Sequence, residues 1–62
     1  MDIKLFKNQA YVTYQKNLKN RDCPYQVHLY GLNGELVDKV MVDTYQSARD
    51  YFKSFCKIAK GL

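Results

Sequence analysis

The last nineteen residues, Thr44 to Leu62, constrain the fold most, because they have the pattern of one amphipathic helix. At about 100° per residue, the apolar side chains collect on one face. These side chains are Ala48, Tyr51, Phe52, Phe55, Ala59 and Leu62. Thr44 is a favourable N-cap residue, and Gly61 is of the type that commonly ends a helix. We therefore expect a helix with defined ends, whose apolar face must be covered by a second layer.

The residues before this helix alternate between apolar and polar side chains, which is typical of β-strands. The alternation is present over residues 10–15, 25–30 and 35–43, and again over residues 2–7. Asn33-Gly34 is a strong signal for a tight hairpin, and it favours a type I′ turn. Residues 16–24 are rich in turn formers and predict a longer loop.

The expected fold is α+β, with a single domain over residues 1–62. A small antiparallel sheet is covered on one face by the C-terminal helix, in the order β-β-β-α. The sheet has three strands, or four if residues 2–7 form a separate strand. The expected core joins Val12, Val27, Leu29, Leu36, Val40 and Val42 to Ala48, Phe52, Phe55 and Ala59. The opposite face of the sheet remains open.

Length and charge favour a binding module over an enzyme. A chain of 62 residues has a marginal core, with little material left for a deep active site. The net charge of +4 suits an acidic partner, either nucleic acid or an acidic protein surface. There is no apolar run of roughly 20 residues that could span a membrane. No signal peptide is visible, so a cytoplasmic location is expected.

The residue types that carry catalysis or metal binding are scarce. His28 is the single histidine and has no defined nucleophile beside it. The aspartates lack the spacing of a metal-binding loop. Cys23 and Cys56 lack the CxxC form of zinc sites, and the sequence leaves open whether they are free or joined by a disulfide. We expect no catalytic residue, no metal and no cofactor.

The leading hypothesis is nucleic-acid binding through the open face of the sheet and the basic loop. Aromatic rings can stack on bases, and cations can bind phosphates. The predicted base contacts are Tyr11, His28 and Tyr30. The predicted phosphate contacts are Lys16, Lys19, Arg21 and Lys39.

The string VDTYQSARDY at residues 42–51 resembles the strand end and capped helix of AP2-type and integrase-arm DNA-binding domains. The resemblance extends over about residues 10–59 and implies a sheet that lies in the DNA major groove. The chain departs from those domains because it has no Trp, and Lys39 is the one cation on its central open strands. The element order also resembles compact single-strand binders that dimerise through a helix.

The alternative hypothesis is a small inhibitor or adaptor that docks on a larger protein through the open face or a sheet edge. Val37 and Met41 are predicted to be exposed beside Tyr30, where they would form an apolar patch. The rear of the helix carries a basic stripe that suits an acidic partner. This stripe consists of Arg49, Lys53, Lys57 and Lys60. The composition suits a phage-encoded or bacterial accessory protein, and a homodimer is a third possibility.

Overall fold

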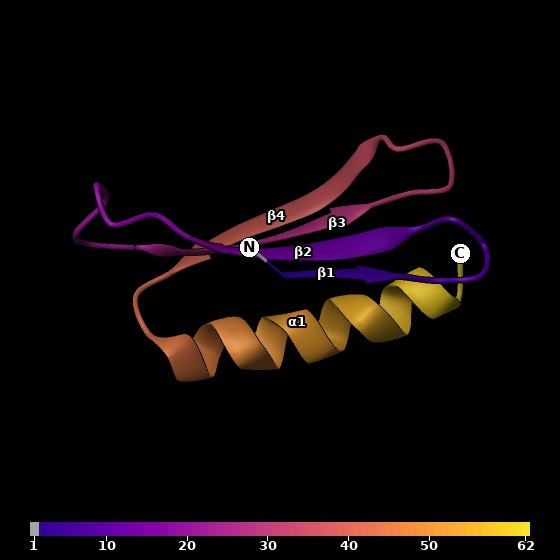
Figure 1. The fold of residues 1–62 in the computed structure, drawn as a ribbon. Coiled ribbons are helices and arrows are strands. Elements are labelled where there is room, and N and C mark those ends of the chain that lie inside the picture. Colours follow the sequence, from indigo (N-terminus) through magenta and orange to yellow (C-terminus); the bar gives the residue numbers. More distant parts are fainter. Residues whose placement is uncertain (1) are drawn as a thin grey trace.

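The computed structural model describes residues 2–62, which form one sheet and one helix (Figure 1). The elements are β1 (Asp2–Leu5), β2 (Tyr11–Lys16), β3 (Tyr25–Tyr30), β4 (Leu36–Val42) and α1 (Tyr45–Lys60). The strands are antiparallel in the order β1-β2-β3-β4, so each pairs with its neighbour in the sequence. The expected α+β fold is confirmed, and the N-terminal segment supplies the fourth strand.

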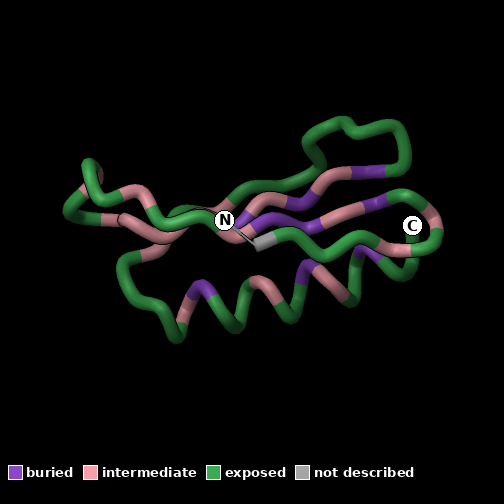
Figure 2. The backbone as a smooth tube through the Cα atoms, viewed as in Figure 1, coloured by how far each residue is buried: buried purple, intermediate pink, exposed green. Residues whose placement is uncertain are grey.

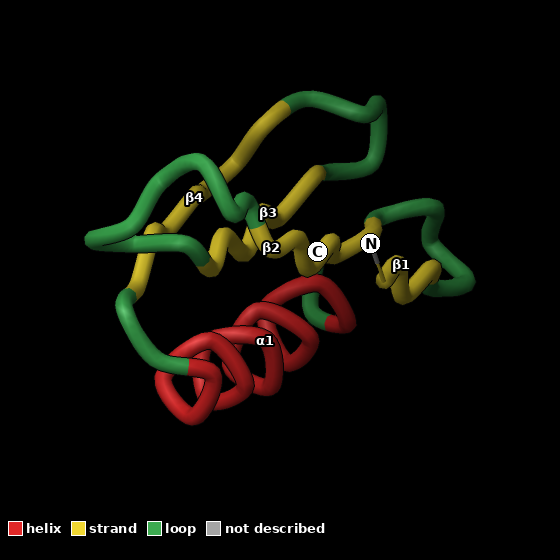
Figure 3. The backbone as a smooth tube through the Cα atoms, turned by 60° about the vertical axis from the view of Figure 1, so that its left-hand side comes forward, coloured by secondary structure: helices red, strands yellow, loops and turns green. Residues whose placement is uncertain are grey.

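The helix covers one face of the sheet and packs against β2, β3 and β4. Figure 2 shows that the buried positions gather on the two central strands and on the side of α1 that faces them. The buried core consists of Ala10, Val12, Val27, Leu29, Ala48, Phe55 and Ala59. Tyr51 and Leu62, which were expected on the apolar helix face, are instead exposed at its margins. Figure 3 shows β1 lying beyond the helix on one side.

Both ends of α1 are capped as expected. Thr44 has an extended backbone, and its hydroxyl accepts a hydrogen bond from the Ser47 N–H at 3.2 Å. At the other end the Gly61 N–H donates to the Ile58 carbonyl at 3.0 Å. Lys57 and Lys60 lie in the last turn, where the helix dipole favours cations.

The β3–β4 hairpin is present, but the predicted type I′ turn is wrong. The Gly34 N–H donates to the Gly31 carbonyl at 3.1 Å, and the Gly31 N–H donates to the Glu35 carbonyl at 2.8 Å. Gly34 has a φ of 79°, whereas Asn33 is not among the described residues with a positive φ. The loop is therefore a type I turn followed by one left-handed residue, which is the usual three-residue hairpin.

The β1–β2 hairpin has the same hydrogen-bond pattern. The Gln9 N–H donates to the Phe6 carbonyl at 2.9 Å, and the Phe6 N–H donates to the Ala10 carbonyl at 3.0 Å. Gln9 has a φ of 74°, so it occupies the left-handed position that Gly34 fills in the other hairpin. The polar pair Asn8-Gln9 marks a break in the sequence, but nothing signals the left-handed position, because glutamine is not a typical residue at a positive φ.

A bulge in β4 overturns the predicted core position of Leu36. Leu29 pairs with Asp38 and Tyr30 pairs with Leu36, so Val37 is an extra residue in β4. An extra residue reverses the alternation of side chains on one side of the bulge. Leu36 therefore lies opposite Tyr30 on the open face, where it is 53% exposed.

Candidate functional site

The sheet face turned away from α1, here called the open face, carries its side chains in three rows across the strands. Directly paired residues of antiparallel strands point to the same face, so the register defines each row. The first row is Leu5, Tyr11, Tyr30 and Leu36. The second row is Ile3, Thr13, His28 and Lys39. The third row contains Gln15, Gln26 and Met41.

The first row is an apolar stripe that crosses all four strands. Its outer residues are strongly exposed: Leu5 by 69% and Leu36 by 53%. The Tyr11 and Tyr30 rings between them are stacked, with centroids 4.5 Å apart and planes 16° apart. Two rings lying flat on the sheet could not come so close, since neighbouring strands are themselves about 4.8 Å apart. Both rings therefore stand on edge, each with one face against the other.

A hydrogen-bonded chain of side chains follows β3 beside this stripe. His28 Nδ1 lies 3.0 Å from the Tyr30 hydroxyl, and His28 Nε2 lies 3.3 Å from Gln26 Oε1. Because the amide oxygen can only accept, Nε2 carries the proton and Nδ1 accepts from the tyrosine. Burial, and secondarily the charge of Lys39, lower the pKa of His28. The neutral imidazole therefore holds Tyr30 and Gln26 in place.

The structure separates the two parts of the predicted nucleic-acid site. Tyr11 begins β2 and Tyr30 ends β3, whereas the loop with Lys19 and Arg21 joins the opposite ends of these strands (Figure 1). Lys16 lies on the helix side of the sheet, with its Nζ 5.3 Å from the centre of the Tyr25 ring. His28 and Lys39 are cross-strand neighbours and do lie on the open face.

The residues of the alternative hypothesis also fall on two surfaces. Val37 and Met41 are exposed by 47% and 41%, and Met41 lies on the open face as predicted. The cations Arg49, Lys53 and Lys57 are exposed on α1, which covers the other side of the sheet.

The sequence did not single out Leu5 and Leu36 for the candidate site. The alternation over residues 2–7 put Leu5 on one side of a strand, and pairing with β2 then sets that side on the open face. No sequence signal could have placed Leu36, because the bulge that moves it arises from the pairing of β3 with β4.

At the outer edge of the sheet, a side chain of β4 binds a backbone N–H of the same strand. The Asp38 carboxylate accepts a hydrogen bond from the Lys39 N–H at 2.7 Å. A charged side chain on an exposed strand opposes pairing with another chain. The open face is therefore a better candidate for binding a partner than the exposed edge of β4 is.

Both Cys23 and Cys56 are free and half-buried. Among the side chains described, no group of three or more His, Cys, Asp or Glu is arranged to hold a metal ion. Over residues 2–62 the helix is neither long nor apolar enough to cross a membrane.

Comparison of the chain with protein-family models, with curated proteins and with solved structures found no match. The geometry of the surface is therefore the basis for inferring function.

Proposed function

We propose that this protein is a binding module whose open face docks on a different and larger protein. The observation that carries the proposal is the apolar stripe of Leu5, Tyr11, Tyr30 and Leu36. Large apolar side chains that are exposed together, with polar side chains beside them, are typical of interaction sites. Tyrosine is also enriched among the residues that contribute most to binding at protein interfaces.

The size and charge of the face suit a protein partner. The molecule measures 34 × 18 × 16 Å between Cα extremes, so one face approaches the roughly 800 Å² that each partner buries in a standard interface. Of the described side chains in the three rows, Lys39 alone carries a formal charge when His28 is neutral. The expected partner surface is an apolar ridge with an acidic group facing Lys39.

A second copy of the chain fits the open face less well. A two-fold axis parallel to the rows and through the centre of the face would place the apolar stripe against Gln15 and Gln26 of the other copy. Burying amides against apolar groups leaves their hydrogen bonds unmade, which is costly. A two-fold axis parallel to the strands would place stripe against stripe, but it would bring Lys39 against Ile3 of the other copy. The charge would then be buried without an acidic partner, because none of the described side chains in the rows is acidic.

The nucleic-acid hypothesis for the open face stays a prediction. Two features disfavour it at this place. The stacked Tyr11 and Tyr30 rings have one face each against the other, so they offer edges rather than open faces to bases. Lys39 is the one cation among the described side chains of the rows, whereas affinity for nucleic acid depends on several contacts between cations and phosphates.

The test is capture from a nuclease-treated cell extract by the purified protein. The variant Leu5→Asp/Leu36→Asp places two charges in the stripe. Leu18→Asp is the matched control, because Leu18 is 78% exposed in the β2–β3 loop. The proposal expects one stoichiometric protein that wild type and Leu18→Asp capture and that the double variant loses at least about tenfold, because a charge would be buried unpaired.

Two outcomes contradict the proposal. One is a set of captured proteins that does not change in the double variant. The other is a wild-type dimer in sedimentation that the double variant converts to monomer, because this result would make a second copy the occupant. Circular dichroism would be used to check that each variant is folded.

A further inference from the structure

Two clefts lie along α1 on the side of β1, and together they are called the groove here. The helix packs against β2, β3 and β4, so the helix-facing side of β1 is left without a helix above it (Figure 3). Lys4 is paired with the buried Val12 and so lies on this uncovered side. Arg49, Lys53 and Lys60 recur every four to seven residues and therefore share one flank of the helix.

Two clefts make up this groove. The larger, of about 520 Å³, lies between β1 with its following turn and the end of α1. It is lined by Lys4, Leu5, Phe6, Lys7, Asn8, Lys60 and Leu62. The smaller, of about 260 Å³, lies between β2 and the start of α1. It is lined by Tyr14, Tyr45, Arg49, Phe52 and Lys53. Together they follow a helix of 16 residues, which is about 24 Å long.

The groove is strongly basic. Its two clefts carry five of the ten Lys and Arg side chains of the protein, and none of the Asp and Glu side chains that the structure describes lines either cleft. Lys4 and Lys60 come from different elements and both act on Cys56, where their charges oppose the rise in thiol pKa caused by burial. Like charges brought together by the fold repel one another, and an anion would relieve that repulsion.

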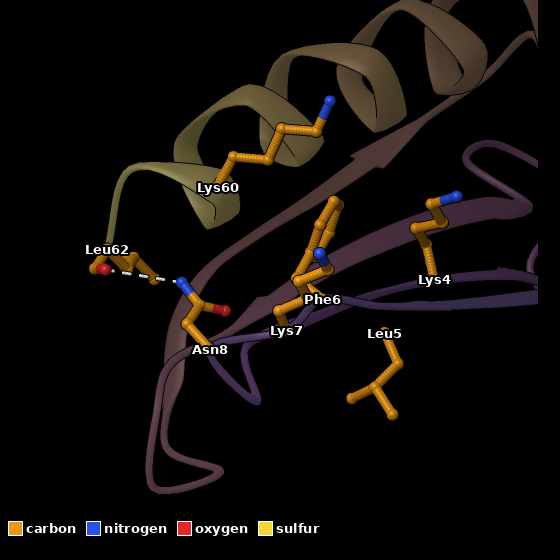
Figure 4. Close-up of a pocket in the computed structure, with 7 residues that line it drawn as sticks. All are labelled: Lys4, Leu5, Phe6, Lys7, Asn8, Lys60 and Leu62. Carbon is orange, nitrogen blue, oxygen red and sulfur yellow. Dashed lines mark hydrogen bonds between the residues drawn. The ribbon is translucent and has the colours of Figure 1, made fainter.

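The larger cleft has a firmly held base. The Asn8 amide donates to the Ala59 carbonyl at 2.8 Å and to the Leu62 carbonyl at 3.3 Å. Its side-chain oxygen accepts from the Ala10 N–H at 3.0 Å. These bonds join the β1–β2 turn to the end of the helix, as Figure 4 shows for the Asn8–Leu62 bond. The lysines of both elements are thus held around one space.

Aromatic rings lie among the cations in both clefts. Figure 4 shows the Phe6 ring extending from the strand toward the helix, in the space between Lys60 and Lys4. In the smaller cleft, the Tyr14 and Tyr45 rings meet edge to face, with centroids 6.0 Å apart. Cations that follow a groove, with aromatic rings between them, are the pattern by which proteins bind single strands of nucleic acid.

We infer that this groove binds single-stranded nucleic acid, with phosphates on the cations and unpaired bases against the rings. The inference concerns a surface that shares Leu5 alone, among the described residues, with the rows of the open face, and it does not depend on the proposed docking function. A single strand is favoured over a duplex because a duplex keeps the faces of its bases stacked inside. The groove cations are then Lys4, Lys7, Arg49, Lys53 and Lys60, a different set from the loop cations predicted from the sequence.

The binding test uses a fluorescent oligothymidine of about 12 nucleotides, within the usual site sizes of single-strand binders. The groove variant is Arg49→Gln/Lys53→Gln/Lys60→Gln. The matched control is Lys16→Gln/Lys19→Gln/Arg21→Gln, which removes the same charge from the predicted loop site. We expect the groove variant to weaken binding at least about tenfold and to lower the salt slope by about two, since each phosphate contact contributes roughly 0.7.

Thiol protection locates the bound strand. Cys56 is close enough to Lys4 and Lys60 for their charges to act on the pKa of its thiol, whereas Cys23 belongs to the β2–β3 loop. The oligonucleotide is expected to slow alkylation of Cys56 and to leave Cys23 unchanged. The unlabelled duplex of the same length should compete poorly. Leu36→Asp changes a residue of the open face that lines neither cleft, and it should bind the oligonucleotide as wild type does.

Several results would overturn the inference. These are an absence of salt-sensitive binding by wild type, equal losses in the two triple variants, or duplex binding as tight as single-strand binding. Protection of Cys23 in place of Cys56 would assign the strand to the loop predicted from the sequence. None of these results bears on capture of a protein by the open face.

Discussion

Gln9 holds a left-handed backbone conformation that costs an L-residue about 1–2 kcal/mol. Its side chain is exposed, so no packing would be lost if it were removed. Glycine adopts this conformation without strain but loses more entropy on folding. We expect Gln9→Gly to raise the free energy of unfolding by about 0.5–1 kcal/mol in urea denaturation.

Gly34 occupies the left-handed position of the β3–β4 hairpin that Gln9 occupies in the β1–β2 hairpin, so it provides the comparison for this prediction. It has a similar φ, and nothing lies within 4 Å of a Cβ added there, so a side chain would meet only backbone strain. Gly34→Ala should therefore lower the free energy of unfolding by about 1 kcal/mol. Loss of stability in Gln9→Gly would show that its side chain, and not its backbone, determines the turn.

His28 gives the protein a defined response to mild acid. Its folded pKa lies below the unfolded value of about 6.5, because burial and then Lys39 disfavour the charged form. The folded state thus binds fewer protons, and its stability is complete above about pH 6.5. Stability falls as the pH decreases from there through the folded pKa.

Lys39→Gln removes the second of these two causes and leaves the larger one, burial, in place. The variant should raise the pKa of His28 only part of the way toward its unfolded value, as followed by NMR titration of the imidazole. Because the chain has one histidine, His28→Gln should also flatten the stability profile in this pH window. An unchanged His28 pKa in Lys39→Gln would show that the lysine charge does not reach the ring.

At the scale of elements, the start of α1 is stabilised by the Thr44 side chain, which replaces a backbone carbonyl as a hydrogen-bond acceptor. The Thr44 hydroxyl accepts from the Ser47 N–H, one of the helix donors that has no carbonyl within the helix. Thr44→Ala should lower the free energy of unfolding by about 1 kcal/mol in urea denaturation. Thr44→Ser keeps the hydroxyl and should retain most of the wild-type free energy of unfolding. Equal losses in the two variants would mean that the methyl group, rather than the hydroxyl, stabilises this end.

The strands show how far an alternating pattern carries a prediction. In β2 and β3 the alternation predicted Val12, Val27 and Leu29 in the core, and all three are buried. In β4 the same reasoning failed at Leu36, because it assumes that each residue faces one partner residue. The extra residue, Val37, exists only relative to β3, so no pattern within β4 alone reveals it.

At the scale of the whole molecule, Phe55 is the large helix side chain that closes the core. It is buried together with Ala48 and Ala59. Truncation of a buried phenylalanine costs about 3–5 kcal/mol. The total free energy of unfolding of a domain of this length is roughly 3–9 kcal/mol, at about 0.05–0.15 kcal/mol per residue.

Phe55→Ala should therefore leave much of the protein unfolded at room temperature, as measured by circular dichroism and urea titration. The matched variant Leu18→Ala alters an exposed side chain and should change the free energy of unfolding by less than about 0.5 kcal/mol. If Phe55→Ala unfolds cooperatively and keeps nearly the wild-type free energy of unfolding, α1 contributes little to the stability of the core.

The sequence alone determined the elements and the closed side of the molecule, including the helix, its caps and the strands, because these depend on residues near one another in the chain. The tertiary structure decided which surfaces could act. Pairing of β3 with β4 moved Leu36 outward, pairing of β1 with β2 completed the apolar stripe, and the position of α1 beside β1 brought Lys4 and Lys60 around one cleft. Each of these surfaces joins residues far apart in the chain, and their proximity follows from strand register and layer packing, which no local pattern encodes.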